Sequence, residues 1–203
     1  LKLLVPEIDR ERYQVRVVLC DRPATRPLAE FFQQLKIPVD FVETHGPTPF
    51  HNFFTALRYF LQQRPSIVHF NLNNSFGCFF PILAAFVAGV RWRLATEHLA
   101  FELASGKRAG IGTKKLVKRI MTFCLHYTVA VSQATKRLLV RDYKIDPVRI
   151  KLIRNCIDAG KFRFSGEGRR RLRNEFGVSD EQLLVGSVAR FSFQKGHEYM
   201  VEA

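Results

Sequence analysis

The 203-residue chain is 47% hydrophobic and carries a formal net charge of +14. A chain of this length and apolar content can bury the core of one domain, or of one domain and part of a second. The charge predicts an anionic partner, for which nucleic acid, anionic lipid and a phosphorylated substrate are the candidates. The sequence contains no zinc-finger spacing, RNA-binding aromatic signature or basic heptads, so the charge alone does not choose among them.

Other features limit the class of protein. The most apolar run, residues 76–90, is shorter than the roughly 20 residues that span a bilayer and contains Pro81, which favours a buried helix. The four cysteines are dispersed without a CxxC pair, so we expect reduced thiols in a cytosolic protein rather than a zinc site. The N-terminus has no secretory signal and resembles the end of a helix, so we expect a fragment at both ends.

Short runs rich in β-branched residues alternate with longer helical patterns. Strands are predicted at residues 13–21, 39–44, 66–72, 91–98, 127–132 and 149–155. Helices are predicted between them at residues 51–63, 76–89, 113–126 and 133–143. This alternation is typical of βαβ units and of a parallel sheet covered on both faces. The sequence therefore predicts the α/β class, as a doubly wound, Rossmann-like domain that binds ligands beyond the carboxyl ends of its strands.

The pattern restarts after a glycine-rich break at residues 157–168. A basic helix is predicted at 169–177, followed by a strand at 183–190, a short loop and the beginning of a helix. We therefore place a domain boundary near residue 164. Residues 1–164 are expected to form one Rossmann-like domain, and residues 165–203 to open a second one.

The loop after the last predicted strand is a candidate phosphate site. Arg190 ends the strand, Lys195 follows in the loop, and Gly196 allows a close approach of the backbone to a ligand. Arginine offers a fork of donors, lysine a point charge, and a helix N-terminus free N–H groups to phosphate oxygens. The alternative is that both cations are ordinary solvated loop residues.

Polar residues near two predicted strand ends are candidates for a ligand cleft. Glu97 and His98 stand where the strand at 91–98 ends, and polar groups at such a point face the crevice of a parallel sheet. His69 and Asn71 alternate on one face of the strand at 66–72. Because buried polar side chains need partners, these residues either line the cleft or have a hydrogen-bonded structural role.

The helix at 113–126 concentrates positive charge on one face. At ~100° per residue, that face carries Lys114, Lys115, Lys118 and Arg119. The opposite face carries Leu116, Val117, Ile120, Phe123 and Cys124. One interpretation packs the apolar stripe on the sheet and leaves the cations in water. The other interpretation is that the basic face attracts an anionic membrane.

Five motifs in chain order resemble a known family. They are SIVHFNL (66–72), TEHL (96–99), YTVAVSQATKRLL (127–139), VRIKLIRNCIDAGKF (148–162) and LLVGSVARFSFQKGHEYMVEA (183–203). Together they resemble the retaining glycosyltransferases of the GT-B fold, family four (glycosyltransferase group 1, RfaB-like). The resemblance covers residues 10–203 and implies an acceptor domain without its first strand and glycine loop, and the opening βα piece of a nucleotide-binding domain. Arg154-Asn155-Cys156 departs from the family's usual Pro-Asn-Gly, and Asn71 replaces a frequent histidine.

The resemblance implies a hexosyltransferase of class EC 2.4. Such an enzyme moves a hexose from a nucleoside diphosphate sugar to a hydroxyl of a glycan or lipid-linked saccharide, with retention and without a metal or other cofactor. The residues that match the family's motifs are Arg190, Lys195 and Gly196 at the donor diphosphate, His98 with Glu97 beside it at the catalytic centre, and His69 and Asn71 on the acceptor side.

The implied partners are the nucleotide sugar, the saccharide or lipid-linked acceptor and an anionic membrane surface, with no nucleic acid. The implied role is in polysaccharide biosynthesis, in the cytoplasm and peripherally at the inner face of the membrane. Because a GT-B site lies between two domains and needs both reactants held in position, the 203-residue chain alone is expected to be inactive.

Two other functions stay open at this stage. A nucleotide-sugar epimerase shares the two-domain cleft but has no separate acceptor, and a downstream acidic glutamate motif would favour the transferase. A basic α/β module that binds nucleic acid without catalysis is the second alternative. DNA binding that persists at high salt would indicate that module, since purely electrostatic contacts weaken as salt rises.

Overall fold

The computed structural model describes residues 2–44, 48–72, 76–98, 111–192 and 195–202. The chain divides into two compact units, residues 1–157 and 158–203. The division falls in the glycine-rich break of the sequence. The assignment of residues 1–164 and 165–203 to two Rossmann-like domains stays a prediction.

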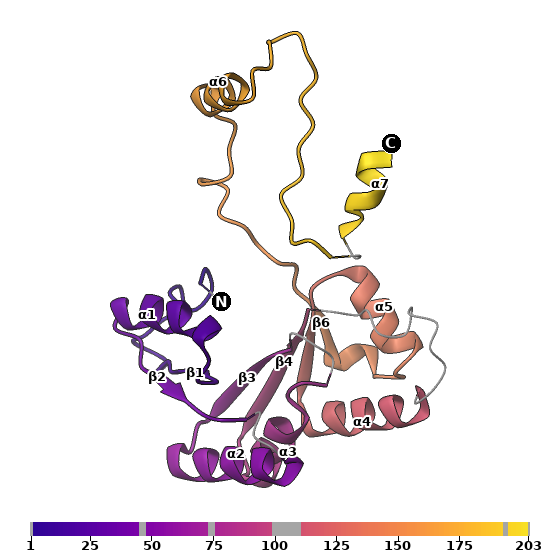
Figure 1. The fold of residues 1–203 in the computed structure, drawn as a ribbon. Helices are drawn as coiled ribbons and strands as arrows, with labels where there is room; N and C mark the ends of the chain where they lie inside the picture. Colours follow the sequence, from indigo (N-terminus) through magenta and orange to yellow (C-terminus); the bar gives the residue numbers. More distant parts are fainter. Residues whose placement is uncertain (1, 45–47, 73–75, 99–110, 193–194, 203) are drawn as a thin grey trace. The chain divides into compact units, whose positions relative to one another are not determined.

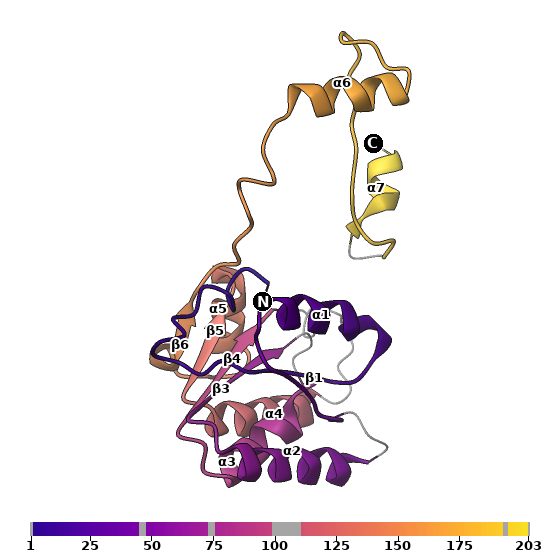
Figure 2. The ribbon, with the colours of Figure 1, turned by 90° about the vertical axis from the view of Figure 1, so that its left-hand side faces the viewer.

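Six parallel strands form two sheets in the described part of the first unit (Figures 1 and 2). β1 (Val17–Leu19) pairs with β2 (Val39–Phe41), and β3 (Ile67–Leu72), β4 (Trp92–Glu97), β5 (Tyr127–Ala130) and β6 (Ile150–Leu152) pair in that order. All six strands predicted before residue 157 are present, each shorter than its predicted range. The prediction of a parallel, Rossmann-like α/β fold is confirmed. The strands lie in two sheets rather than one, because β1 and β2 pair with each other and not with the other described strands.

The helices of the first unit follow the predicted order, with one addition. α2 (Pro49–Gln63), α3 (Phe79–Val87), α4 (Ile111–Cys124) and α5 (Gln133–Arg141) lie at or near the predicted ranges, with short 3-10 turns at η1 (Pro23–Thr25) and η2 (Pro147–Arg149). α1 (Arg26–Gln34) is a helix that the sequence pattern did not predict. Residues 2–12 form turns and bends rather than the end of a helix, which corrects that expectation.

One face of the four-stranded sheet is apolar and carries a layer of helices. Side chains alternate along a strand, so Phe70 and Leu72 of β3 share a face with Ala95 of β4. Helices α2, α3 and α4 lie along one side of this sheet in both views (Figures 1 and 2). The three helices add these buried residues to the same core: Ala56, Phe60, Ile82, Ala84, Ala85, Met121 and Cys124.

The apolar run at residues 76–90 contributes the core helix α3. Pro81 lies in the first turn of α3, where a missing N–H is tolerated, and is itself buried. In the parts of the chain that the structure describes, no helix is long and apolar enough to cross a membrane.

Two arginines fix the C-terminal end of α4. The Arg149 guanidinium donates to the Thr122 carbonyl at 2.7 Å, and Arg93 Nε donates to the Cys124 carbonyl at 2.6 Å. The last carbonyls of a helix have no intrahelical partner, and the helix dipole favours positive charge beside them. α4 is therefore attached to β4 and to the turn before β6 by charge-assisted hydrogen bonds as well as by apolar packing.

The Asp40 carboxylate connects the two-stranded sheet to α2. It accepts hydrogen bonds from Arg16 at 2.8 Å and from the Tyr59 hydroxyl at 2.7 Å. Burial raises the pKa of Tyr59, and the hydrogen bond to Asp40 raises it further, so the phenol stays a donor. Phe32 of α1 is buried with Val17 and completes the small core of this sheet.

The second unit contains α6 (Gly166–Glu175) and α7 (His197–Glu202). The predicted basic helix is present as α6, and Ser165 caps it by accepting from the Gly168 N–H at 3.0 Å. The strand predicted at residues 183–190 is not formed, and Val188 is fully exposed. A strand needs a neighbouring strand that pairs with its N–H and C=O groups. The described residues between 158 and 203 contain no strand with which residues 183–190 could pair.

Candidate functional site

Four polar residues meet on the second face of β3 and β4. His69 Nε2 shares a hydrogen bond of 2.8 Å with Thr96 Oγ1. His98 Nε2 lies 3.5 Å from Asn71 Oδ1. Alternation along the strands places all four side chains away from the apolar face. This polar cluster consists of His69, Asn71, Thr96 and His98.

Parallel pairing brings the polar cluster together. His69 is in register with Leu94, and Asn71 is in register with Thr96. His69 therefore contacts Thr96, two residues beyond Leu94, and Asn71 in the same way contacts His98, two residues beyond Thr96. The His98 N–H donates to the Leu72 carbonyl at 3.4 Å and continues the ladder past the end of β4. The cluster therefore lies at the carboxyl ends of two adjacent parallel strands, where open α/β sheets bind ligands.

The cluster contains two neutral imidazoles. Partial burial lowers the pKa of His69 below its ordinary value of 6.5, and the nearby His98 ring lowers it further. Burial likewise lowers the pKa of His98. At neutral pH each ring therefore has one N–H donor and one acceptor nitrogen. Neutral donors and acceptors of this kind can recognise the hydroxyl groups of a saccharide.

Thr96 is the member of the cluster that the sequence pattern did not single out. It is buried and hydrogen-bonded to His69. The signal that could have found it is the period of two along β4, because Thr96 shares a face with His98 two residues later. The predicted residues His69, Asn71 and His98 do lie together.

Glu97 lies on the other face of β4, in an ion pair with Lys118 of α4. Each residue is 1% exposed, and Lys118 Nζ donates to Glu97 Oε2. Taking two charges out of water is costly, and only a close, well-formed pair offsets the cost. Glu97 and His98 are neighbours in sequence but face opposite sides of the strand. The structure gives Glu97 a contact that positions α4, and a catalytic role for it stays a prediction.

Lys118 does not belong to the exposed basic face that the helical pattern predicts. Its ammonium is buried against Glu97, which corrects the assignment of this residue to a membrane-facing surface. Lys114, Lys115 and Arg119 are exposed. Polarity along a helix cannot distinguish a solvated lysine from one that pairs with a buried carboxylate on a neighbouring strand.

The apolar stripe of α4 is also placed differently from the prediction. Leu116, Ile120 and Phe123 are 59%, 38% and 69% exposed, whereas Val117 and Cys124 turn toward the core. The expectation that the whole stripe packs on the sheet is therefore wrong for three of its members. With Lys118 directed inward, the opposite side of the helix faces away from the sheet.

The cysteines and potential metal ligands complete the description of the first unit. Burial raises the pKa of Cys78 to about 11, which keeps its thiol protonated at neutral pH and weakly nucleophilic. Each of the four cysteines lies in the described part of the chain, and none of them forms a disulfide bond. Across the described ranges, no group of three or more His, Cys, Asp or Glu side chains is arranged to hold a metal ion.

The residues predicted to hold a diphosphate lie in the second unit. Arg190 and Lys195 are exposed. Gly196 has a φ of 61°, a left-handed conformation that glycine adopts without strain. The His197 Nε2–H donates to the Arg190 carbonyl at 3.2 Å, which brings the backbone of Arg190 to the beginning of α7. Diphosphate binding by these residues stays a prediction.

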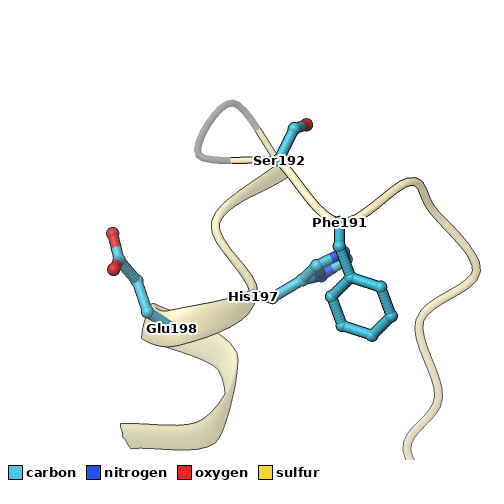
Figure 3. Close-up of a pocket in the computed structure, with 4 residues that line it drawn as sticks. All are labelled: Phe191, Ser192, His197 and Glu198. Carbon is cyan, nitrogen blue, oxygen red and sulfur yellow. The ribbon is translucent and has the colours of Figure 1, made fainter.

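A small pocket lies beside this loop (Figure 3). The rings of Phe191 and His197 stand side by side, with their centroids 5.1 Å apart in an edge-to-face arrangement. Ser192 and Glu198 also line the pocket, and their side chains point away from the two rings. None of these four residues was predicted from the sequence.

The fold is that of the GT-B glycosyltransferases, as solved structures show. HepE (Alr3699) from Anabaena in complex with UDP has a TM-score of 0.73 and 20% identity, covering 99% of this chain and 52% of HepE. Its complex with UDP-glucose has a TM-score of 0.70 and 18% identity, covering 92% and 48% of the two chains. A glycosyltransferase from Rickettsia africae ESF-5 has a TM-score of 0.66 and 17% identity, covering 92% and 47%.

Residues 1–161 match Glycosyltransferase Family 4, and the chain belongs to this family. The chain spans about half the length of the solved structures it resembles. Comparison with curated proteins finds no significant match.

The buried ion pair gives a prediction about stability. Lys118→Met leaves the Glu97 carboxylate buried without the ammonium, and should lower the free energy of unfolding by about 3–5 kcal/mol. The double variant Glu97→Gln/Lys118→Met removes both charges, so it should cost clearly less than the two single changes added together. Denaturant unfolding of Lys118→Met, Glu97→Gln and the double variant measures the three free energies of unfolding that this comparison needs.

The matched control is Lys115→Met, which changes an exposed lysine of the same helix and should cost under about 0.5 kcal/mol. If Lys118→Met behaves like Lys115→Met, or the two single changes add without coupling, the pair does not hold α4 in place.

Proposed function

We propose that the whole protein containing this chain transfers a hexose from a nucleoside diphosphate sugar to a hydroxyl group, with retention at the anomeric carbon. The observation that carries the proposal is the polar cluster at the carboxyl ends of β3 and β4 in a chain that belongs to Glycosyltransferase Family 4. HepE, which shares this fold, has been solved with UDP and with UDP-glucose, and this supports a nucleotide sugar as the donor.

His98 is proposed to contact the donor sugar. Its lowered pKa keeps the imidazole neutral at pH 7, so one nitrogen can bond to a sugar hydroxyl while the other faces Asn71. Glycosyl transfer passes through an oxocarbenium-like state in which positive charge grows on the anomeric carbon. A neutral ring can orient the sugar without repelling that charge. Glu97, on the far side of β4, is proposed to position the strand end through Lys118.

Arg190 and Lys195 are proposed to bind the donor diphosphate. The bond between the anomeric carbon and the diphosphate oxygen breaks while the acceptor oxygen bonds to that carbon on the same face. The acceptor proton passes to the leaving phosphate. Negative charge therefore grows on the diphosphate, where a guanidinium, an ammonium and free backbone N–H groups stabilise it. Gly196 allows the backbone to approach the phosphates, and in this scheme neither a metal nor another cofactor is required.

The acceptor is proposed to be a hydroxyl of a glycan or of a lipid-linked saccharide. His69 and Asn71 lie next to His98 on the same face of the sheet. Their neutral side chains can donate and accept hydrogen bonds with the acceptor saccharide. The corresponding role is polysaccharide biosynthesis at the cytoplasmic side of the membrane. Residues 99–110, which follow His98 in the sequence, lie outside the described residues.

The donor assignment predicts a loss of nucleotide affinity. In the whole protein, Arg190→Ala and Lys195→Ala should each weaken UDP binding by about 10- to 150-fold, because each removes a charge-assisted contact worth about 1.5–3 kcal/mol. Calorimetric titration with UDP measures the change. Arg163→Ala, which removes another exposed cation of the same unit, is the control and should bind as the wild type does. Wild-type affinity in both site variants would refute the assignment.

The cluster predicts a separate effect on turnover. His98→Ala should lower kcat for hexose transfer by about 100-fold or more while changing UDP affinity little, since the ring acts on the sugar rather than on the nucleotide. His98→Gln, which retains a hydrogen-bond donor and acceptor, should recover part of the loss. Steady-state kinetics decide the point, with the exposed His51→Ala as control. An unchanged kcat in His98→Ala would leave His98 with a structural role.

A further inference from the structure

The two histidines of the polar cluster are held by hydrogen bonds of different quality. His69 Nε2 lies 2.8 Å from Thr96 Oγ1, well within the range of a good hydrogen bond. His98 Nε2 lies 3.5 Å from Asn71 Oδ1, at the outer limit of such a bond. The protein therefore fixes the His69 ring before a ligand binds, whereas the weaker contact leaves the His98 ring able to adjust to one.

Thr96 is a rigid support for the His69 ring. It is only 8% exposed. Its strand, β4, is paired with β3 on one side and with β5 on the other, where Thr96 is in register with Val129. A β-branched side chain also has a restricted choice of χ1 rotamers. The backbone and the side chain of Thr96 are thus both constrained, and its hydroxyl has a fixed position on the sheet.

The hydrogen bond decides which atoms of His69 face Thr96 and which are left for a ligand. The χ2 torsion of histidine is broad and roughly two-fold. A half-turn about it exchanges Nδ1 with Cδ2 and Nε2 with Cε1, so an imidazole without a partner presents a nitrogen in one orientation and a carbon in the other. The contact with Thr96 Oγ1 selects the orientation in which Nε2 is bonded to the protein, and so sets the position of Nδ1.

Both tautomers of the neutral His69 ring fit this arrangement. Its lowered pKa leaves the ring with one N–H and one acceptor nitrogen at pH 7. The Thr96 hydroxyl can donate to Nε2 or accept from it. Nδ1 is an acceptor when Nε2 carries the proton and a donor when it does not. A saccharide hydroxyl, which both donates and accepts, can bond to Nδ1 in either case.

We propose that Thr96 is a positioning residue for the transfer reaction, which fixes the His69 ring so that Nδ1 bonds to a hydroxyl of the acceptor saccharide. The inference rests on the transferase function proposed above and on the acceptor-side role of His69. Thr96 touches no reactant and acts only through His69. A ring that is held in its binding orientation from the start loses less freedom when the acceptor binds, and this gain appears in the rate of transfer.

The alternative is that the bond between Thr96 and His69 only satisfies two polar groups of the sheet. Removing it would then lower stability without selectively changing the acceptor step. The position of the pair favours the positioning role. It lies at the carboxyl ends of β3 and β4, beside Asn71 and His98, and this edge is where open α/β sheets bind ligands.

The experiment compares Thr96→Val with Thr96→Ser in the whole protein, using the best pair from a panel of UDP- and GDP-hexoses and of mono- and disaccharide acceptors. Valine keeps the β-branched shape without the hydroxyl, and serine keeps the hydroxyl. Thr96→Val should lower kcat/KM for the acceptor by about tenfold, and Thr96→Ser should retain most of it. UDP affinity and the hydrolysis of the donor without acceptor should stay unchanged in both. Thr96→Ala, which also lacks the hydroxyl, should behave as Thr96→Val does.

Three comparisons separate positioning from a structural role. In a His69→Ala background, Thr96→Val should have no further effect on kcat/KM, because Thr96 acts through His69. The matched control is Thr128→Val, the same change at a buried threonine of β5 that shares a face with Ala95, and it should leave the kinetics unchanged. In the imidazole NMR spectrum, Thr96→Val should shift the ring signals of His69 and not those of the exposed His51.

The role of Thr96 is contradicted if Thr96→Val keeps the wild-type kcat/KM, if Thr96→Ser is impaired as strongly as Thr96→Val, or if Thr96→Val costs as much with His69→Ala as without it. In each of these cases the wild type is active, so the transferase function stands. Unchanged His69 ring signals in Thr96→Val would contradict the positioning role whatever the activity. A wild type that binds UDP but transfers no hexose within the panel would contradict the transferase function itself, and the role of Thr96 with it.

Discussion

The ion pair between Glu97 and Lys118 sets how helix α4 sits on the sheet. Both side chains are almost completely buried, and separating them would leave a charge in the protein interior. Lys118 must therefore point at the end of β4, and this direction fixes the rotation of the whole helix. Arg93 and Arg149 hold the carbonyls at its C-terminal end and prevent the helix from turning there. One buried contact thus decides which residues of α4 face the core and which face outward.

The alternation of side chains on β4 links this contact to the polar cluster. Glu97 faces the helix layer, while Thr96 and His98 on either side of it face the other side of the strand with His69 and Asn71. The ion pair with Lys118 holds Glu97, and with it the end of β4, against α4. It therefore also fixes the position of His98, the next residue of the chain. In the function that we propose, the helix layer and the sugar-facing side of the cleft are therefore coupled through a single strand. The same anchoring leaves Leu116, Ile120 and Phe123 on the outer surface.

The sequence predicted the parallel α/β fold because β-branched strands and helical segments alternate clearly from residue 13 to residue 155. It named His69, Asn71 and His98 as candidates for a ligand cleft but did not predict that they meet, because that depends on the pairing and register of β3 and β4. It did not predict α1, where Pro27 near the helix start and Phe31 and Phe32 gave the available signal. The sequence pattern assigned Lys118 to the exposed basic face, because helical periodicity sorts residues only by their polarity. It contains no information about Glu97, the buried carboxylate on β4 with which Lys118 pairs. The segment 183–190 reads as a strand, but β propensity produces a strand only where a neighbouring strand supplies hydrogen bonds.

Acylation of lysines in the native protein, followed by peptide mass spectrometry, tests the orientation of α4 most directly. Lys114, Lys115 and Lys118 lie within five consecutive residues of one helix, so sequence context and helix stability are nearly the same for all three. Lys114 and Lys115 should react readily, whereas Lys118 should stay protected until the protein unfolds, because its ammonium is buried on Glu97. Modification of Lys118 at the rate of Lys115 in the folded protein would contradict the account, since the helix would then present its lysines to water together.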